Sequence, residues 1–553
     1  MNGFRFLFGK IKVMILIGLP AVCLPSVEFD ILLKNATIYD GSGQMPYTGS
    51  IGISGDRIEA IGAITGAKGK QELDLNGLAV APGFINMLSW ACRSLIEDGR
   101  SQSDIRQGVT LEVMGEGFSM GPLSDAMKAK RLNNQTDIKF DIEWTTLGQY
   151  LAYLEKRGVS TNVASFVGHG TLREYVIGME NRPATHEELQ QMKELVKQAM
   201  QEGAVGFSSA LIYQPSSYAD TKELVELAKI ASQYHGMYIS HIRNEGSQLV
   251  ESVQELISIA RHAKVDSEIY HFKASGIANW HQLDEAIELI EKARSEGIQI
   301  TADMYTYHAS STGLSVQLPD WVRDGGMEKV LTRLEDPLIR EKILGEMKLS
   351  HPPENIMLLS FKNKALRKFS GKRLNEVAEL SGKSPTETAL DLIAEDKSRI
   401  GVAYFSMDEK NVAKKVALPW MSFCSDAGSY TTEGVFISQP THPRAYGSFA
   451  RVLGKFSRDE GLLTLQEAVR KLSALPAQNL KLEQRGMLKK GYFADVVVFD
   501  PEKIQDNATF QNPHQYATGM VHVWVNGVQV LNNGEHTQAK PGRFVMGPGV
   551  SKR

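Results

Sequence analysis

The segments MYISHIRNEG (residues 237–246) and IYHFKASG (residues 269–276) share one construction. In each, an apolar run with β-branched and aromatic residues leads directly to a histidine, His241 or His271, with a basic residue and a glycine close behind. Short apolar runs of this kind are typical of buried strands. Two strand-end histidines beside basic residues favour metal ligands over structural hydrogen-bonding groups, because burying such charge without an ion is costly.

Two further segments end in a carboxylate. VMGEG (residues 113–117) places Glu116 between two glycines, and FCSDAG (residues 423–428) leads an apolar run to Asp426. The simpler interpretations are a turn residue at Glu116 and a helix-capping residue at Asp426. We favour Glu116 as a third metal ligand. Asp426 is the candidate general base, which would accept the proton of a metal-activated water and deliver it to a leaving nitrogen.

Eight strand candidates occur along the chain, and helical patterns separate most of them. Residues 246–263, for example, place Leu249, Val253 and Leu256 on one helical stripe. This alternation predicts an α/β fold, a TIM-type (β/α)8 barrel, in which the carboxyl ends of the strands converge on one mouth. A glutamate and two imidazoles at such a mouth suit one zinc ion with an open coordination position. The strand candidates are residues 80–86, 108–115, 162–170, 204–209, 237–243, 267–273, 298–305 and 421–428.

Both ends of the chain carry short strand patterns with tight turns, such as the Asn526-Gly527 pair. Neither end can bury a core alone, so we expect one small β-sandwich built from both, with the barrel inserted between them. The stretch between Tyr307 and Met421 is too long for a loop and contains helical patterns. The expected domains are a β-sandwich from residues 27–79 and 485–553, and a barrel over residues 80–484 with a helical insertion at about 308–420.

The first 26 residues resemble a secretory signal peptide. Basic residues precede the apolar run VMILIGLPAVCLP (residues 13–25), which is too short to span a bilayer comfortably. We expect export to the bacterial periplasm and no stable membrane span. Anchoring as a lipoprotein through Cys23 is not expected, because the preceding Leu-Pro-Ala-Val is a poor lipobox.

The composition restricts the class of partner. The 553 residues include 61 basic and 64 acidic side chains, which argues against a nucleic-acid binder. A small molecule with a carboxylate is the expected partner, since Arg444, Lys273, Tyr305 and Ser311 are candidates to clamp one. The sequence leaves the oligomeric state open.

Several long motifs resemble the amidohydrolase superfamily, in particular its N-acyl-D-amino-acid deacylase (D-aminoacylase) branch. The resemblance runs along nearly the whole mature chain and implies a barrel with a β-sandwich from both chain ends. It also implies His241 and His271 as zinc ligands, Asp426 as general base, and Lys273, Tyr305, Ser311 and Arg444 as the residues that hold the substrate carboxylate. The motifs are AVAPGFIN (79–86), QGVTLEVMGEGFSMGP (107–122), GAVGFSSALIY (203–213), YISHIRNEG (238–246), YHFKASG (270–276), DMYTYHASST (303–312), SDAG (425–428), HPRAYGSFARVLG (442–454) and KKGYFADVVVFDP (489–501).

The chain departs from the family pattern in two places. Where the superfamily usually has a His-x-His pair after the first strand, this chain has Leu88-Ser89-Trp90, so the second metal position is expected to be weak or absent. Where the deacylase branch has a cysteine in Gly-Asn-Cys-Gly, this chain has the shorter Gly115-Glu116-Gly117. The deacetylase branch acting on N-acetylglucosamine 6-phosphate is similar in holding one metal with a Glu and two His, by analogy only.

The expected function is therefore a one-zinc amide hydrolase that deacylates N-acyl-D-amino acids. One alternative keeps the barrel and the zinc but acts on cyclic amides or dipeptides. The other is a non-catalytic, ligand-binding relic that has lost activity together with the His-x-His pair.

Overall fold

The computed structural model describes residues 1, 3, 28–64 and 66–550. Apart from residues 1 and 3, the predicted signal segment lies outside the described residues. Across the part of the chain that is described, no helix is both long and apolar enough to cross a bilayer. The fold belongs to the α/β class.

The centre of the molecule contains two parallel sheets that adjoin at both edges. One has the order β6-β7-β8 and the other the order β17-β13-β12-β11-β10-β9. One residue separates β8 from β9, and Ser89 of β6 forms a parallel bridge with Ala427, which follows β17. The strands are β6 (Phe84–Ser89), β7 (Val109–Met114), β8 (Asn162–Ser165), β9 (Val167–Gly168), β10 (Gly206–Ala210), β11 (Met237–His241), β12 (Ser267–Ile269), β13 (Ile300–Met304) and β17 (Met421–Phe423).

Helices separate most of these strands. Helix α8 buries the predicted stripe of Leu249, Val253 and Leu256. Replacing such a buried leucine by alanine costs about 2–5 kcal/mol, so the stripe accounts for the docking of the helix. The helices are α1 (Ser94–Glu97), α2 (Gln102–Ile105), α3 (Asp125–Asn133), α4 (Leu147–Arg157), α5 (His169–Val176), α6 (His186–Gln201), α7 (Thr221–Gln233), α8 (Leu249–Ala263), α9 (Gln282–Ser295), α15 (Glu409–Ala417), α16 (Arg444–Arg451), α17 (Leu465–Leu472) and α18 (Ala474–Asn479).

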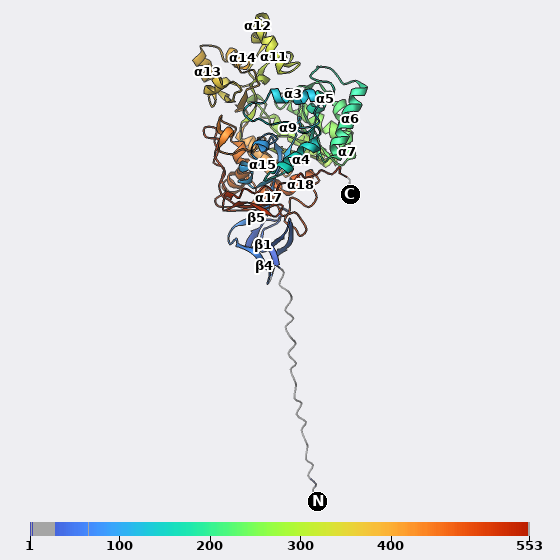
Figure 1. Cartoon of the computed structure of the whole chain (residues 1–553), viewed down its shortest axis with the longest axis vertical. Coiled ribbons are helices and arrows are strands. Elements are labelled where there is room, and N and C mark those ends of the chain that lie inside the picture. Colours follow the sequence, from blue (N-terminus) through green and yellow to red (C-terminus); the bar gives the residue numbers. More distant parts are fainter. Residues whose placement is uncertain (2, 4–27, 65, 551–553) are drawn as a thin grey trace.

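Strands from both ends of the chain form one mixed sheet. Strand β5 pairs with β1 on one side and antiparallel with β18 on the other. Leu33 and Ile51 from the first part share a buried core with Val498 and Trp524 from the last. Figure 1 shows β1, β4 and β5 together at one end of the molecule. The strands are β1 (Glu28–Ile38), β2 (Tyr47–Ser54), β3 (Arg57–Gly62), β4 (Lys68–Asp74), β5 (Ala79–Pro82), β18 (Val496–Phe499), β19 (Met520–Val525), β20 (Val528–Asn532) and β21 (Glu535–His536).

The stretch predicted as a helical insertion also contains a three-stranded antiparallel sheet of order β14-β16-β15. Its residues form a core of their own that includes Leu314, Leu390 and Val402. In Figure 1 its helices α11–α14 lie at the end of the molecule opposite β1. The elements are β14 (Ser310–Gly313), α10 (Asp320–Arg323), α11 (Met327–Glu335), α12 (Pro337–Glu346), β15 (Ile356–Ser360), α13 (Leu374–Ser381), α14 (Pro385–Asp396) and β16 (Gly401–Tyr404).

Candidate metal centre

Glu116 follows β7 and is held by the glycines on either side of it. Gly115 and Gly117 have φ values of 102° and 61°, in the region that favours glycine. A Cβ on Gly115 would collide with the Phe166 carbonyl oxygen, and one on Gly117 would collide with Ala210. The two glycines therefore allow the chain to turn tightly, so that the Glu116 carboxylate is buried where the strands end.

His241 ends β11 and His271 follows β12, and both imidazoles meet the Glu116 carboxylate. Nδ1 of His241 and Nε2 of His271 each lie 2.9 Å from Oε1 of Glu116. The ligand atoms of the three residues all lie within 4.8 Å of one another, and all three side chains are buried. Three potential ligands, at the ends of three strands, therefore surround one position. A carboxylate oxygen and two imidazole nitrogens form a donor set that fits a zinc ion.

The electrostatics of this cluster favour a cation. Burial by itself raises the pKa of Glu116, but the charge of His271 and hydrogen bonds from both imidazoles outweigh it and hold that pKa below its ordinary value. Burial and Lys273 lower the pKa of His271, but Glu245 and Glu116 raise it further, to about 10. Without an ion, then, His271 carries a proton between two carboxylates. A ligating imidazole must be neutral, so a divalent cation would take the place of that proton.

Glu245 is a residue of this centre that the sequence motifs did not single out. Its Oε1 lies 3.0 Å from Nδ1 of His271, and its Oε2 lies 3.7 Å from Nε2 of His241. Nζ of Lys273 lies 2.5 Å from Oε1 of Glu245 and 2.8 Å from Nδ1 of His271. In each imidazole, one nitrogen thus faces Glu116 and the other faces Glu245. Its place in the YISHIRNEG motif, four residues after His241, was the available signal.

Asp426 is held on both sides of its carboxylate. Its Oδ2 lies 2.7 Å from the guanidinium of Arg444, and its Oδ1 accepts a hydrogen bond of 3.1 Å from the Trp90 indole. Burial raises the pKa of Asp426, against the opposing effect of Arg444. The charges of His271 and Glu116 also act on this carboxylate, which relates it to the metal-ligand cluster.

The four residues predicted to hold a substrate carboxylate occupy different surroundings. The Arg444 guanidinium lies 4.4 Å from the centre of the Tyr305 ring, and Nζ of Lys273 lies 5.8 Å from the same ring. Within the described residues, Nε of Arg444 and the hydroxyl of Tyr305 have no hydrogen-bond partner although both are buried. The hydroxyl of Ser311 donates to the Val402 carbonyl over 2.8 Å, within the small sheet of the insertion.

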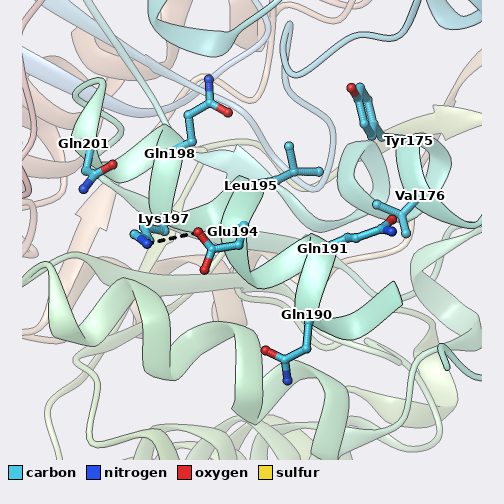
Figure 2. Close-up of a pocket in the computed structure, with 9 residues that line it drawn as sticks. All are labelled: Tyr175, Val176, Gln190, Gln191, Glu194, Leu195, Lys197, Gln198 and Gln201. Carbon is cyan, nitrogen blue, oxygen red and sulfur yellow. Dashed lines mark hydrogen bonds and ion pairs between the residues drawn. The ribbon is translucent and has the colours of Figure 1, made fainter. Parts of the chain in front are cut away.

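A large surface groove lies elsewhere. It has a volume of about 610 Å³ and is lined by residues of α6 and the end of α5, none of which belongs to the cluster above. Figure 2 shows glutamine side chains in its lining and the ion pair between Glu194 and Lys197, whose charged atoms are 3.0 Å apart. This groove is therefore separate from the cluster at the strand ends.

The chain is similar to several known proteins. Residues 440–531 match the model of the amidohydrolase family. The chain is 34% identical to a D-aminoacylase of Alcaligenes xylosoxydans xylosoxydans, over 94% of this chain and 98% of that one.

Two solved structures resemble the fold over 94% of this chain and 100% of their own, each with a TM-score of 0.79. One is an N-acyl-D-glutamate deacylase from Bordetella bronchiseptica complexed with zinc and a phosphonate inhibitor, 29% identical. The other, 31% identical, is a D-aminoacylase with a binuclear metal centre, described as showing one-metal activation and second-metal attenuation. Taken with the identity to D-aminoacylase along nearly the full length of both sequences, these matches show that the chain belongs to the amidohydrolase family, in its D-aminoacylase branch.

Proposed function

We propose that this chain is a zinc-dependent amide hydrolase that removes the acyl group from N-acyl-D-amino acids. The observation that carries the proposal is the convergence of Glu116, His241 and His271, whose ligand atoms lie within 4.8 Å of one another. It is supported by the relatives, which include a D-aminoacylase and an N-acyl-D-glutamate deacylase.

One zinc ion would be held by Glu116, His241 and His271. When bound, zinc supplies Lewis-acid chemistry, polarising the scissile carbonyl and lowering the pKa of water. Leu88 and Trp90 offer no ligand where the superfamily usually has two histidines, so we infer that a second ion is weakly held or absent. The one-metal activation described for a D-aminoacylase supports activity with a single ion.

Asp426 is the proton carrier in this proposal. Its carboxylate would take the proton of the attacking water and pass it to the nitrogen of the departing amino acid. A raised pKa suits this task, because a stronger base accepts the proton more readily and still releases it to an amine.

Arg444 and Tyr305 are the groups best placed to hold the substrate carboxylate. Both present buried polar atoms that have no hydrogen-bond partner among the described residues, and such atoms are costly unless a ligand satisfies them. Lys273 contributes positive charge beside the Tyr305 ring. Ser311 donates its hydroxyl proton to the Val402 carbonyl and would have to exchange that bond to donate to a carboxylate; we keep it in the proposed clamp on the strength of the family motif.

We also infer the finer architecture. The parallel strands β6–β13 and β17 would close into one TIM-type barrel, supported by the Ser89–Ala427 bridge between its first and last strands. The strands at the two chain ends would form one β-sandwich, supported by their shared core. Residues 1–26 would direct export to the periplasm. Amino-terminal sequencing of the mature protein tests this inference, and an intact Met1 would refute it.

The substrate proposal is tested by metal analysis beside a substrate panel. The panel contains N-acetyl-D-amino acids, including those of D-glutamate and D-aspartate, their L counterparts, hydantoins and β-aspartyl dipeptides. We expect about one zinc per chain and turnover of acylated D-amino acids. Turnover limited to hydantoins or dipeptides would establish the alternative hydrolase, and bound zinc without any turnover would establish the relic.

A further inference from the structure

Trp90 is a partly exposed aromatic residue in direct contact with the proposed general base. Its side chain follows β6 and remains 39% exposed, yet its indole Nε1 donates a hydrogen bond of 3.1 Å to Oδ1 of Asp426. Arg444 lies 2.7 Å from the other oxygen, Oδ2. The carboxylate therefore accepts a hydrogen bond from a neutral donor at Oδ1 and forms an ion pair with a cation at Oδ2.

The backbone ties the same two segments together. The amide of Asp426 donates to the Leu88 carbonyl and the amide of Trp90 donates to the Ala427 carbonyl, each over 2.9 Å. Asp426 also has a φ of 48°, in the left-handed region that few non-glycine residues adopt. Main-chain hydrogen bonds thus fix the position of the Asp426 backbone, and the hydrogen bond from the Trp90 indole fixes the orientation of its carboxylate.

We propose that Trp90 is a positioning residue for the hydrolysis: its indole N–H orients Oδ1 of Asp426 and stabilises the charged carboxylate that accepts the proton. This inference rests on the proposed function, because it requires Asp426 to be the general base. An indole N–H is a donor only, so Trp90 acts on the reaction through the carboxylate and not by transferring a proton itself.

The proposal has a signature in the pH profile. A hydrogen bond to the charged form of a carboxyl favours that form, so removing the indole N–H raises the pKa of Asp426 and moves the acid limb of kcat to higher pH. A purely structural tryptophan would leave this limb in place. The other titratable groups that act on Asp426 are unaltered by a change at position 90; they are Arg444, His271, Glu116, Lys273, Asp303, Cys424 and Tyr305.

The test compares Trp90→Phe, which keeps an aromatic ring and removes the N–H, with the matched control Trp321→Phe. The Trp321 indole also donates to a carboxylate, that of Glu346 over 2.7 Å, but at an exposed place in the insertion. In zinc-loaded Trp90→Phe we expect kcat to fall roughly ten- to a hundredfold, with KM nearly unchanged and the acid limb moved upward. Trp321→Phe is expected to keep the kcat and the profile of the unaltered protein.

Melting temperature and zinc content confirm that each variant is folded and loaded. Trp90→Leu carries the same expectation and replaces Trp90→Phe if that variant does not fold. A folded, zinc-loaded variant at position 90 with unchanged kcat and pH profile would overturn the inference.

A double-mutant cycle separates this inference from the proposed function. If Trp90 acts through Asp426, adding Trp90→Phe to Asp426→Asn should cause no further loss of activity. Independent, multiplied losses would overturn the role of Trp90 while leaving Asp426 as the base. Full activity of Asp426→Asn alone would instead remove the proposed base, and the inference about Trp90 with it.

Discussion

Individual side chains carry the chemistry of this molecule, and most of them combine burial with an unusual charge environment. Glu116, His271 and Lys273 are each less than a tenth exposed. Buried charge of this kind is stable only when it is paired or bound to an ion. Glu116 pairs with His271, and Lys273 pairs with Glu245.

Replacing Asp426 by asparagine should abolish most of the activity while zinc remains bound. Asparagine keeps the shape of the side chain but cannot accept the proton, so we expect kcat to fall by roughly 10²–10⁴-fold. Steady-state kinetics with elemental analysis measure both effects. Activity within a factor of about two of the unaltered protein would contradict a general acid–base role, since such a role contributes far more.

The pH profile gives a second prediction at this scale. Burial raises the pKa of Asp426, and only the charged form can act as a base, so activity is present above that pKa and lost as pH falls through it. The acid limb of kcat against pH should therefore lie above 3.8, the ordinary value for an aspartate. A rate that stays flat down to that value would contradict the assignment.

Replacing Glu245 by glutamine should weaken metal binding more than it disturbs the fold. Carboxylates behind ligating histidines orient the imidazoles, and their loss typically lowers metal affinity 10–100-fold. Competition with a chelator measures this affinity without any assay of activity. Glu226→Gln, which removes a carboxylate that pairs with Lys193 and Lys229 on the surface, is the matched control and should leave the affinity unchanged.

Among the secondary-structure elements, α2 and β7 meet in a pair of buried carboxyls. Asp104 of α2 accepts a hydrogen bond from Ser103, and Glu112 of β7 accepts one from Asn86 over 3.0 Å. Burial raises the pKa of Asp104 to about 6, and burial with the charge of Asp104 raises the pKa of Glu112. A carboxyl with a raised pKa in the folded state stabilises the fold below its unfolded value, and that stability is lost as pH rises through about 6.

Asp104→Asn should therefore stabilise the protein at pH 8 and have little effect at pH 5. Ionising the buried Asp104 lowers the free energy of unfolding by on the order of 1–3 kcal/mol. The neutral amide of asparagine avoids this cost. Thermal melts at the two pH values measure the difference. The same change in melting temperature at both would show that packing, and not ionisation, governs this site.

The sequence predicted where strands occur along the chain better than it predicted which strands pair. Strands β11 and β12 lie within the segments quoted for His241 and His271, because a short apolar run that ends in a polar group is a local signal. The small sheet of the insertion was missed, because β14, β15 and β16 have 4, 5 and 4 residues and pair across long stretches of chain.

The contacts of Glu245 and Trp90 could not be predicted for a related reason. Both depend on which strand ends adjoin and at what distance, and sequence spacing alone contains neither quantity. The bridge between Ser89 of β6 and Ala427, which follows β17, shows that these two strand ends are neighbours.

At the scale of the whole molecule, the central parallel strands lie between the insertion and the terminal sheet. The insertion has a core of its own, and the terminal sheet joins both ends of the chain (Figure 1). Deleting residues 485–553 would remove β18–β21 and leave β5 without one of its two neighbours.

This deletion should make the protein insoluble, because it leaves an apolar strand edge exposed to other chains. The soluble fraction after expression, compared with that of the full chain, measures the effect. A soluble, zinc-binding fragment of residues 28–484 would show that the barrel is stable without the terminal sheet.

The pairing of β5 with β18 has a consequence for how the protein is made. Val80 of β5 pairs with Val498 of β18, so β5 leaves the ribosome long before β18 is synthesised. At usual elongation rates the wait is roughly 20–80 s. Until then β5 lacks this partner, so the terminal sheet can be completed only after nearly the whole chain has been made.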